Sequence, residues 1–177
     1  TGLTFGHQGQ VSQLDTDLVV GCDGRGSSVR RRAASAIELQ PEQYDVLWFK
    51  LPAPPQLSHT CQFYLMAEFQ EYPASCYTSW AGQLLYGLIL PKGTLTKLDG
   101  LDWLELAARP APAWLSAHLL AQRQKVSPPA RLNVVVGCCQ RWSAPGVLLL
   151  GDAAHPMSPV RAQGINLALR DAIVAAN

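Results

Sequence analysis

The spacing of hydrophobic and polar residues divides the chain into a middle zone rich in strands and two end zones. Short stretches rich in β-branched and aromatic residues predict strands. These stretches are Val46–Leu51, Gln62–Phe69, Cys76–Trp80, Gln83–Leu90 and Leu132–Cys138, with Ala81-Gly82 as a tight hairpin connection. Helical spacing predicts helices over Leu98–Ala108 and Ala113–Gln122, which Pro110 and Pro112 separate. This order predicts an antiparallel sheet with helices on one side.

The first end zone contains a buried strand that leads into a glycine cluster. Gly6-His7-Gln8-Gly9 predicts a turn, and Val11–Leu14 a short strand. The apolar run Asp17–Cys22 is typical of a buried strand that ends at a functional loop. Ser27 or Ser28 can then cap a short helix over Val29–Ser35.

The last end zone repeats the order of strand, loop and helix. Pro145-Gly146 predicts a turn before a strand at Val147–Leu150, and a helix is expected from about Gly164 to the end. Ile165, Leu169, Ala172 and Ile173 have spacings that place them on one face of that helix. The fold class expected is α+β: an α/β portion formed by the chain ends, and an antiparallel sheet with flanking helices between them. The expected domain limits are 1–35, 36–141 and 142–177.

Composition narrows the function classes. The chain is 48% hydrophobic and 15% charged, and a charged fraction below the usual quarter predicts that much surface is covered by a cofactor, a partner or further polypeptide. A net charge of +1, with Arg30–Arg32 as the one basic run, argues against nucleic-acid binding. No stretch is apolar enough to span a bilayer, and no secretory signal is visible. The chain starts at Thr1, so we expect upstream residues to be missing.

The cysteines do not indicate a bonded framework. Their number is five, which is odd, and none forms C-x-x-C, so neither a disulfide framework nor a zinc site is predicted. Buried, reduced thiols are expected, with Cys138 and Cys139 on opposite faces of a strand. No catalytic residue and no metal ligand is predicted.

The first segment with candidate chemistry runs from Asp23 to Arg30. A glycine-rich turn between a strand and a helix start can bind an anion, because backbone N–H groups point outward and the helix dipole adds positive potential. Gly24 and Gly26 supply G-x-G, but Val29 occupies the third glycine position of the dinucleotide-binding fingerprint. Taken alone, the segment fits a tight strand–helix turn equally well.

The second segment runs from Gly151 to Asn166. Asp152 follows a buried strand, where its carboxylate can accept hydrogen bonds from ligand hydroxyls. Ala153 and Ala154 allow a ligand to approach the backbone, as does Gly164 where the next helix begins. The alternative is an aspartate that only caps a helix. The clustering of small residues and prolines in one short stretch favours the ligand site.

Together the two segments resemble the paired signatures of the class A flavoprotein monooxygenases, the family of p-hydroxybenzoate hydroxylase and the ubiquinone-biosynthesis hydroxylases. Asp23-Gly24, with Ser27 and Arg30, is similar to that family's D-G motif, and Gly151-Asp152-Ala153-Ala154-His155 to its G-D motif. The resemblance covers essentially the whole chain. It implies a partial FAD/NAD(P)-binding monooxygenase fold.

The resemblance also implies roles for individual residues. Gly151, Asp152 and Ala153 would form the FAD-binding turn, with Asp152 on the ribityl hydroxyls. Pro159 and the helix start at Gly164, Ile165 and Asn166 would lie along the isoalloxazine. The D-G residues Asp23, Gly24, Ser27 and Arg30 would support both FAD and the nicotinamide cofactor. The aromatic-rich middle zone would form the sheet over which the substrate lies.

Two departures from the family pattern stand out. The N-terminal strand–G-x-G-x-x-G–helix that binds the ADP half of FAD is absent, so the missing N-terminal part of the same protein becomes an expected partner. Arg161 stands where many relatives have glycine; its side chain could pair with a phosphate or with reduced flavin, or narrow the pocket. The isolated chain is expected to bind FAD weakly or not at all and not to be competent in catalysis.

The function implied is FAD-dependent hydroxylation of an organic, often aromatic, small molecule with dioxygen and NADH or NADPH. The alternatives are a flavin-dependent reductase, dehydrogenase or halogenase of the same fold, and a truncated FAD-binding module without catalysis. A cytoplasmic protein is expected, with contact at a membrane surface left open because some ubiquinone-pathway relatives act on lipid-soluble substrates. His155 is expected to make a supporting hydrogen bond near the cofactor, and Arg170-Asp171 to be a solvated or locally paired couple.

Overall fold

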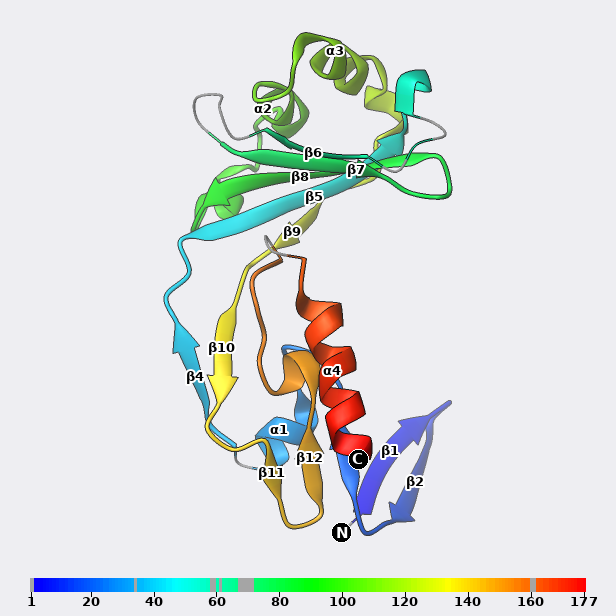
Figure 1. The fold of residues 1–177 in the computed structure, drawn as a ribbon, viewed down its shortest axis with the longest axis vertical. Coiled ribbons are helices and arrows are strands. Elements are labelled where there is room, and N and C mark those ends of the chain that lie inside the picture. Colours follow the sequence, from blue (N-terminus) through cyan, green and yellow to red (C-terminus); the bar gives the residue numbers. More distant parts are fainter. Residues whose placement is uncertain (1, 34, 58–59, 61, 67–71, 160–161) are drawn as a thin grey trace. The chain divides into compact units, whose positions relative to one another are not determined.

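The computed structural model describes residues 2–33, 35–57, 60, 62–66, 72–159 and 162–177. The chain forms two compact units (Figure 1). Residues 1–42 and 134–177 make up one, called the terminal unit below, and residues 43–133 make up the other, called the middle unit. The mixed fold class with antiparallel sheets, predicted from the sequence, is confirmed.

The middle unit is built on a five-stranded antiparallel sheet with the order β6-β7-β8-β5-β9. The strands are β5 (Tyr44–Pro52), β6 (Phe63–Met66), β7 (Ala74–Thr78), β8 (Gln83–Pro91) and β9 (Ala130–Leu132). Gly82 adopts a left-handed φ of 69° in the β7–β8 connection, where the tight turn was expected. Ala67–Phe69 of the predicted Gln62–Phe69 strand lie outside the described residues.

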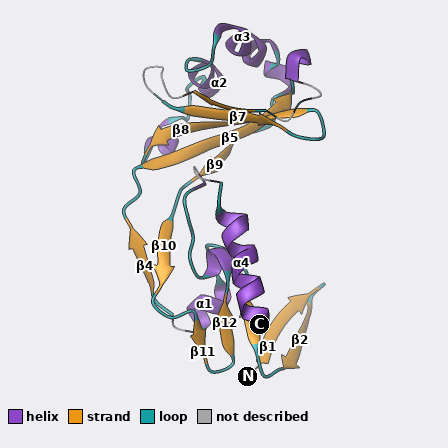
Figure 2. Cartoon of the chain, in the orientation of Figure 1, coloured by secondary structure: helices purple, strands orange, loops and turns teal. Residues whose placement is uncertain are grey.

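Helices α2 (Trp103–Ala108) and α3 (Ala113–Ala121) cover one face of this sheet, as Figure 2 shows. Alternate side chains of β5 and β8 point toward them, so that Leu47, Phe49, Leu84 and Tyr86 are buried. The Phe49 and Tyr86 rings stack with centroids 5.1 Å apart. The Tyr86 hydroxyl donates to the Ala107 carbonyl oxygen at 2.7 Å, which satisfies its polar end inside the core. The predicted sheet with helices on one side is therefore confirmed.

Helix α2 is shorter than the Leu98–Ala108 helix that the spacing predicts. Two features delay its start. Gly100 adopts a left-handed φ of 84°, which no α-helix residue has. The Asp102 side chain accepts a hydrogen bond from the Glu105 N–H at 3.1 Å and so caps the helix at Trp103. Leu98 still belongs to the core, but from a turn that follows the 3-10 helix η2 (Thr94–Lys97).

The terminal unit contains three small sheets. In the first, β1 (Gly2–His7) pairs with β2 (Gln10–Asp15). In the second, β4 (Ile37–Gln40) pairs with β10 (Val136–Cys139). The third has the order β11-β12-β3, in which β12 (Val147–Leu149) runs parallel to β3 (Val19–Gly21) and antiparallel to β11 (Ser143–Ala144). Helix α1 (Ser28–Arg32) follows β3, and α4 (Gly164–Ala176) ends the chain.

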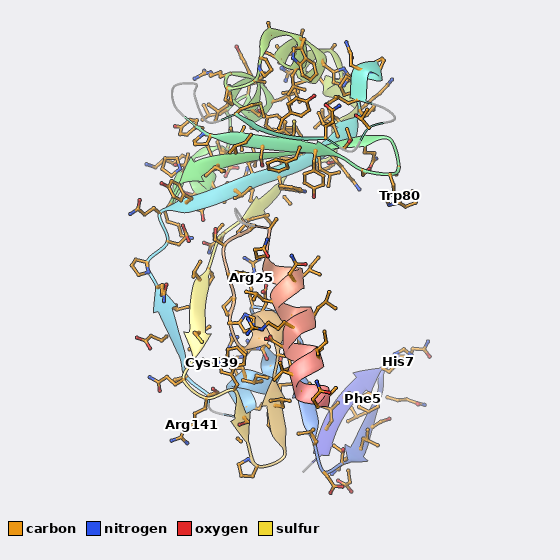
Figure 3. All side chains as sticks on the ribbon, in the orientation of Figure 1. Phe5, His7, Arg25, Trp80, Cys139 and Arg141 are labelled. Atoms are coloured by element: carbon orange, nitrogen blue, oxygen red, sulfur yellow. The ribbon has the colours of Figure 1, made fainter. Side chains whose placement is uncertain are left out.

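The predicted turn at Gly6–Gly9 joins two strands rather than preceding one. Gln8 and Gly9 both have positive φ, 50° and 81°, which fits a two-residue hairpin connection with the twist of its strands. Gly2–His7 therefore forms a strand that the sequence reading missed. The side chains of this hairpin, including Phe5 and His7 in Figure 3, are exposed among the described residues.

The single strand predicted over Leu132–Cys138 is wrong. The chain forms β9 in the middle unit and β10 in the terminal unit, and passes from one unit to the other between Asn133 and Val134. Each half pairs with a different strand, β9 with β5 and β10 with β4. Consequently β4 and β10 belong to the terminal unit, although both fall inside the 36–141 range expected for the middle domain.

The cysteines fit the expectation in part. Cys76 and Cys139 are buried, and burial raises the pKa of the Cys76 thiol to about 12. Cys22 and Cys138 are exposed, so the expectation of buried thiols is wrong for these two. Because Cys138 and Cys139 are successive residues of β10, their side chains point to opposite faces, as predicted. Cys61 lies outside the described residues.

Candidate functional site

The two chemistry-bearing segments follow neighbouring parallel strands. Asp23-Gly24 follows β3 after one residue, Cys22, and Gly151-Asp152 follows β12 after one residue, Leu150. The Leu150 N–H donates to the Gly21 carbonyl oxygen at 3.0 Å, which extends the pairing to the ends of both strands. Since parallel strands present their carboxyl ends at one edge of a sheet, the two segments meet there. That edge is where open α/β sheets bind ligands.

In the first segment, the Asp23 carboxylate occupies the start of helix α1. Its two oxygens accept hydrogen bonds from the Ser27 hydroxyl and from the Ser28 and Val29 N–H groups, the latter at 2.6 and 3.3 Å. The Ser27 hydroxyl oxygen in turn accepts from the Arg30 N–H at 3.0 Å and caps the helix, as the sequence predicted for Ser27 or Ser28. The N–H groups that could have bound an external anion are thus used by Asp23.

Arg30 joins the two segments. Its guanidinium is buried and donates to the Ala153 carbonyl oxygen at 2.8 Å and to the Arg25 carbonyl oxygen at 2.6 Å. Ala153 belongs to the 3-10 turn η4 (Gly151–Ala153), and Arg25 to the loop after Asp23. The fixed fork of donors on arginine suits two carbonyls at once. Arg30 therefore holds the D-G loop against the G-D turn.

The G-D turn is also held from the other side, by helix α4. Gly151 has a left-handed φ of 57°, and a Cβ there would lie 3.1 Å from the Ala168 Cβ, so glycine allows the helix to pack closely. The Gly151 N–H donates to Oδ2 of Asp171 at 2.8 Å. His155 Nε2 lies 2.5 Å from the same oxygen, and the His155 ring packs against Trp142 with centroids 4.7 Å apart and planes tilted by 30°.

Asp152 differs from these residues because its carboxylate is free. It is half-buried, and no donor among the described residues reaches it. At the start of α4 the N-terminal N–H groups have no side-chain cap, since Gln163 makes no capping bond and its Oε1 accepts from the Asn166 amide at 3.1 Å. A free carboxylate and an uncapped helix start suit a ligand with hydroxyls and a region of negative charge.

All eleven predicted site residues lie in the terminal unit. Seven of them form two groups. Asp23, Ser27 and Arg30 use their side chains to hold the D-G loop and the G-D turn. Asp152 and the α4 start at Gly164, Ile165 and Asn166 keep hydrogen-bonding capacity for a ligand. Ile165 is 77% exposed, and a Cβ at Gly24 would meet no atom within 4 Å.

The remaining expectations on this segment have mixed outcomes. Pro159 is exposed, and Arg161 lies outside the described residues. His155 makes the supporting hydrogen bond that was expected of it. The expectation for Asp171 is wrong: its carboxylate is 11% exposed and is bonded across to the G-D turn. Asp171 is the one acidic residue of α4, and its place in this helix was the signal that could have indicated the contact.

The family model for the FAD binding domain matches residues 1–177, the entire chain. The chain belongs to this FAD binding domain family. FAD is thus the cofactor of its family, and the resemblance to FAD-dependent monooxygenases is confirmed.

One relative of this chain is 6-methylpretetramide 4-monooxygenase of Streptomyces rimosus. It is 37% identical over 164 residues, which are 90% of this chain and 38% of that enzyme. The chain therefore spans well under half the length of this relative. The PqsL protein of Pseudomonas aeruginosa is similar in structure, with a TM-score of 0.72 and 25% identity over 95% of this chain and 46% of that one. The flavin-dependent brominase Bmp2 shares the fold at a TM-score of 0.74 and 16% identity, covering 99% of this chain and 46% of its own.

Within the described residues, no three His, Cys, Asp or Glu side chains come together as metal ligands. No helix in the same residues is long and apolar enough to cross a membrane.

Replacing Arg30 with methionine is expected to destabilise the terminal unit by about 2–4 kcal/mol. The substitution keeps much of the buried volume but removes the two hydrogen bonds that the guanidinium donates to the Ala153 and Arg25 carbonyls, and hydrogen bonds to charged groups contribute about 1.5–3 kcal/mol each. Urea denaturation gives the free energy of unfolding. Arg32→Met, at an exposed position of the same helix, is the control and should change stability by less than about 0.5 kcal/mol. Equal effects of the two variants would contradict a stabilising role for the hydrogen bonds from Arg30 to Ala153 and Arg25.

The Asp23 cap predicts a pH dependence of stability. Burial alone raises the pKa of Asp23, but the hydrogen bonds from Ser27, Ser28 and Val29 outweigh it, and the net pKa lies below its ordinary value of 3.8. Because the folded-state pKa is lowered, the carboxylate stabilises the fold fully above pH 3.8 and loses this effect as pH falls through the folded-state pKa. Asp23→Asn should therefore flatten the fall of the urea midpoint below about pH 4. Asp17→Asn, at an exposed position before β3, is the control and should show the same decrease of the urea midpoint as the parent. A parent-like decrease in Asp23→Asn would refute the role of the Asp23 carboxylate in this pH dependence.

Proposed function

We propose that the protein is an FAD-dependent monooxygenase that hydroxylates an organic, aromatic small molecule. The observation that carries the proposal is the free Asp152 carboxylate after β12, together with the uncapped start of helix α4, in a chain of the FAD binding domain family. The Streptomyces rimosus relative, a monooxygenase by name, supports the reaction class. The activity of the whole protein is part of the proposal, because the chain spans 38% of that relative.

In the proposed complex, Asp152 accepts hydrogen bonds from the ribityl hydroxyls of FAD. The N–H groups at Gly164, Ile165 and Asn166 face the pyrimidine edge of the flavin, where the positive end of the helix dipole favours negative charge. Gly151 and Ala153 line the turn next to the ribityl chain, and Pro159 lies along the ring. Asp23, Gly24, Ser27 and Arg30 support this arrangement through the Arg30 bridge to Ala153.

The chemistry that bound FAD supplies is two-electron reduction by NADH or NADPH and activation of dioxygen, so that one oxygen atom enters the substrate. The protein's part is to orient the ring and to exclude water from it. Arg30 and Asp171 hold the Gly151–Ala153 turn on two sides, which fixes the direction of the Asp152 carboxylate. No side chain of the chain needs to act as nucleophile or metal ligand in this scheme.

The face of the middle-unit sheet opposite α2 and α3 suits an aromatic substrate. Trp48 and Tyr77 lie on it with ring centroids 5.8 Å apart, and Phe63 stacks with Tyr77 at 6.5 Å. Gly87 lies under the Trp48 ring, where a Cβ would be 2.8 Å from the ring carbons, so glycine allows the indole to lie against the sheet. We propose this aromatic face as the substrate side of the middle unit.

Three alternatives to a monooxygenase are considered. The brominase Bmp2 shares the fold, so a flavin-dependent halogenase of similar architecture is the second candidate. A reductase or dehydrogenase would use the same FAD and NAD(P)H but no oxygen transfer. A truncated FAD-binding module would bind FAD but catalyse no reaction. These alternatives differ in the fate of dioxygen and halide.

The experiment compares the complete polypeptide that the gene encodes with the 177-residue chain. Each is incubated with FAD, freed of excess cofactor, and examined by visible absorption. We expect the complete protein to retain flavin, to oxidise NADH or NADPH faster with an aromatic substrate, and to place one atom of ¹⁸O₂ in the product. We expect the 177-residue chain to retain little flavin. Halide-dependent product indicates the halogenase, oxygen-independent reduction indicates the reductase, and no retained flavin in either protein refutes the proposal. The choice between NADH and NADPH and a cytoplasmic location stay predictions.

A further inference from the structure

We propose that Asp171 and His155 are positioning residues for FAD: together they set the relation between the Asp152 turn and the start of helix α4. This inference rests on the proposed function, since it assigns the pair a task only if FAD binds at these two elements. Neither side chain needs to touch the cofactor.

The pair connects parts that lie far apart in the sequence. Asp171 lies in the second half of α4, while Gly151 and His155 lie in the segment that follows β12. One oxygen, Oδ2 of Asp171, accepts the Gly151 N–H at 2.8 Å and lies 2.5 Å from Nε2 of His155. A carboxylate that bonds two groups of the same turn fixes both the position and the orientation of that turn against the helix.

Close packing between Ala168 and Gly151 also restricts how the turn can move against helix α4. Ala168 lies one turn before Asp171 on the same helix face, and the Ala168 Cβ would be only 3.1 Å from a Cβ at Gly151. The helix and the turn are therefore in direct contact at Ala168 and bonded at Asp171. The Trp142 ring packs against the His155 ring, with centroids 4.7 Å apart and planes tilted by 30°, which restricts the movement of the imidazole.

The burial of the pair shows that it is not an ordinary surface contact. The Asp171 and His155 side chains are 11% and 14% exposed, whereas Ile165, Leu169 and Ile173 of the same helix are more than half exposed. The face of α4 that packs against the turn is thus the one that carries Asp171. A cleft of about 590 Å³ in the terminal unit is lined by both members of the pair and by Arg170.

The pair affects FAD binding because it fixes the positions of the two groups proposed to bind FAD, the Asp152 carboxylate and the N–H groups at the start of α4. Asp152 is the residue directly after Gly151, and the free N–H groups are at the first turn of the helix that carries Asp171. A shift of the turn along the helix would change the separation between the hydroxyl acceptor and the helix start. Binding and the electronic environment of the flavin would change together.

The test uses the complete polypeptide with Asp171→Leu, Asp171→Asn and His155→Gln. Arg170→Gln is the matched control, because Arg170 lines the same cleft without a hydrogen bond to the turn among the described residues. The Kd for FAD is measured by quenching of flavin fluorescence, the visible spectrum of bound flavin is recorded, and hydrogen exchange at the Gly151 amide is measured without FAD. The free energy of unfolding of each apo variant is measured as well.

We expect Asp171→Leu to raise the Kd for FAD about 10- to 100-fold, to shift the flavin band and to speed exchange at Gly151, since it removes hydrogen bonds to a charged group. Asp171→Asn should recover part of all three changes, because its amide oxygen still accepts. His155→Gln should have smaller effects in the same direction, and it keeps the test available if Asp171→Leu does not fold. Arg170→Gln should match the parent.

Two results would overturn the proposal. The first is a parent-like Kd and flavin spectrum in Asp171→Leu, or in His155→Gln and Asp171→Asn if the leucine variant does not fold. The second is a loss of stability with an unchanged spectrum of the flavin that still binds, which would make the pair a purely structural contact. Failure of the parent protein to bind FAD would instead refute the proposed function. The Gly151 exchange rates would still report on the contact itself in that case.

Discussion

Replacing Asp152 with alanine is expected to weaken FAD binding by about 10- to 100-fold while leaving the fold intact. The carboxylate is half-buried after β12 and has no donor among the described residues, so its hydrogen-bonding capacity is available to a ligand. A hydrogen bond to a charged group contributes about 1.5–3 kcal/mol, and each 1.4 kcal/mol is a factor of ten in affinity. Since no contact within the described chain uses the carboxylate, its loss should cost little stability.

The measurement is the Kd for FAD from fluorescence quenching, made on the complete polypeptide together with urea denaturation. Asp17→Ala is the matched control, since Asp17 is an exposed aspartate of the same unit, in the turn before β3. Asp152→Asn should fall between the parent and Asp152→Ala, because an amide oxygen still accepts but carries no charge. A parent-like Kd in Asp152→Ala would remove Asp152 from the site, and a large loss of stability would assign the carboxylate to the fold.

Replacing Tyr86 with alanine is expected to destabilise the middle unit by about 3–5 kcal/mol, the usual cost of removing a buried aromatic ring. Tyr86 has no exposed surface and stacks on Phe49, so its removal leaves a cavity between the sheet and α2. Its hydroxyl also satisfies the Ala107 carbonyl. Burial raises the pKa of the Tyr86 hydroxyl, which therefore stays a donor at any pH at which the protein is handled.

Two control variants separate the contribution of the buried Tyr86 ring to stability from that of its hydroxyl and from the effect of removing an exposed aromatic ring. Tyr86→Phe keeps the ring and should cost only about 0.5–1.5 kcal/mol, the net contribution of one hydrogen bond. Trp80→Ala removes a fully exposed ring from the β7–β8 connection, shown in Figure 3, and should change stability by less than about 0.5 kcal/mol. The free energy of unfolding in urea gives all three values. Equal losses in Tyr86→Phe and Tyr86→Ala would show that packing of the ring is not the dominant contribution.

Local sequence patterns were sufficient for most strands of the middle unit. β5 and β8 alternate large apolar side chains toward the helices, and the Ala81-Gly82 turn sets the register of β7 against β8. The pattern was also sufficient for the Ser27 cap and for the start of α4 at Gly164, because both depend on residues within one turn of the helix. Family membership came from two short motifs and is confirmed by the match over the whole chain.

Patterns were insufficient wherever a distant residue decides the outcome. The Leu132–Cys138 run contains one polar residue, Asn133. Its two halves pair with different strands in different units, and pairing partners are not encoded in a strand's own spacing. In α4 the apolar residues Ile165, Leu169 and Ile173 share a face, as predicted, but that face is exposed in the described structure. The helix packs on the turn through Ala168 and Asp171 instead.

The sequence by itself determined most strands of the middle unit, the helix at the end of the chain, the family and the two loops that carry the chemistry, because caps, turns and strand alternation are local properties of the chain. Only the tertiary structure decided which of the site residues hydrogen-bond within the protein and which have groups available to a ligand. It shows that Arg30 bonds to Ala153, 123 positions away, and that Asp171 bonds to Gly151. It also shows Asp152 without a donor among the described residues. Whether a polar side chain supports the fold or serves a ligand depends on which groups the fold brings within hydrogen-bonding distance of it.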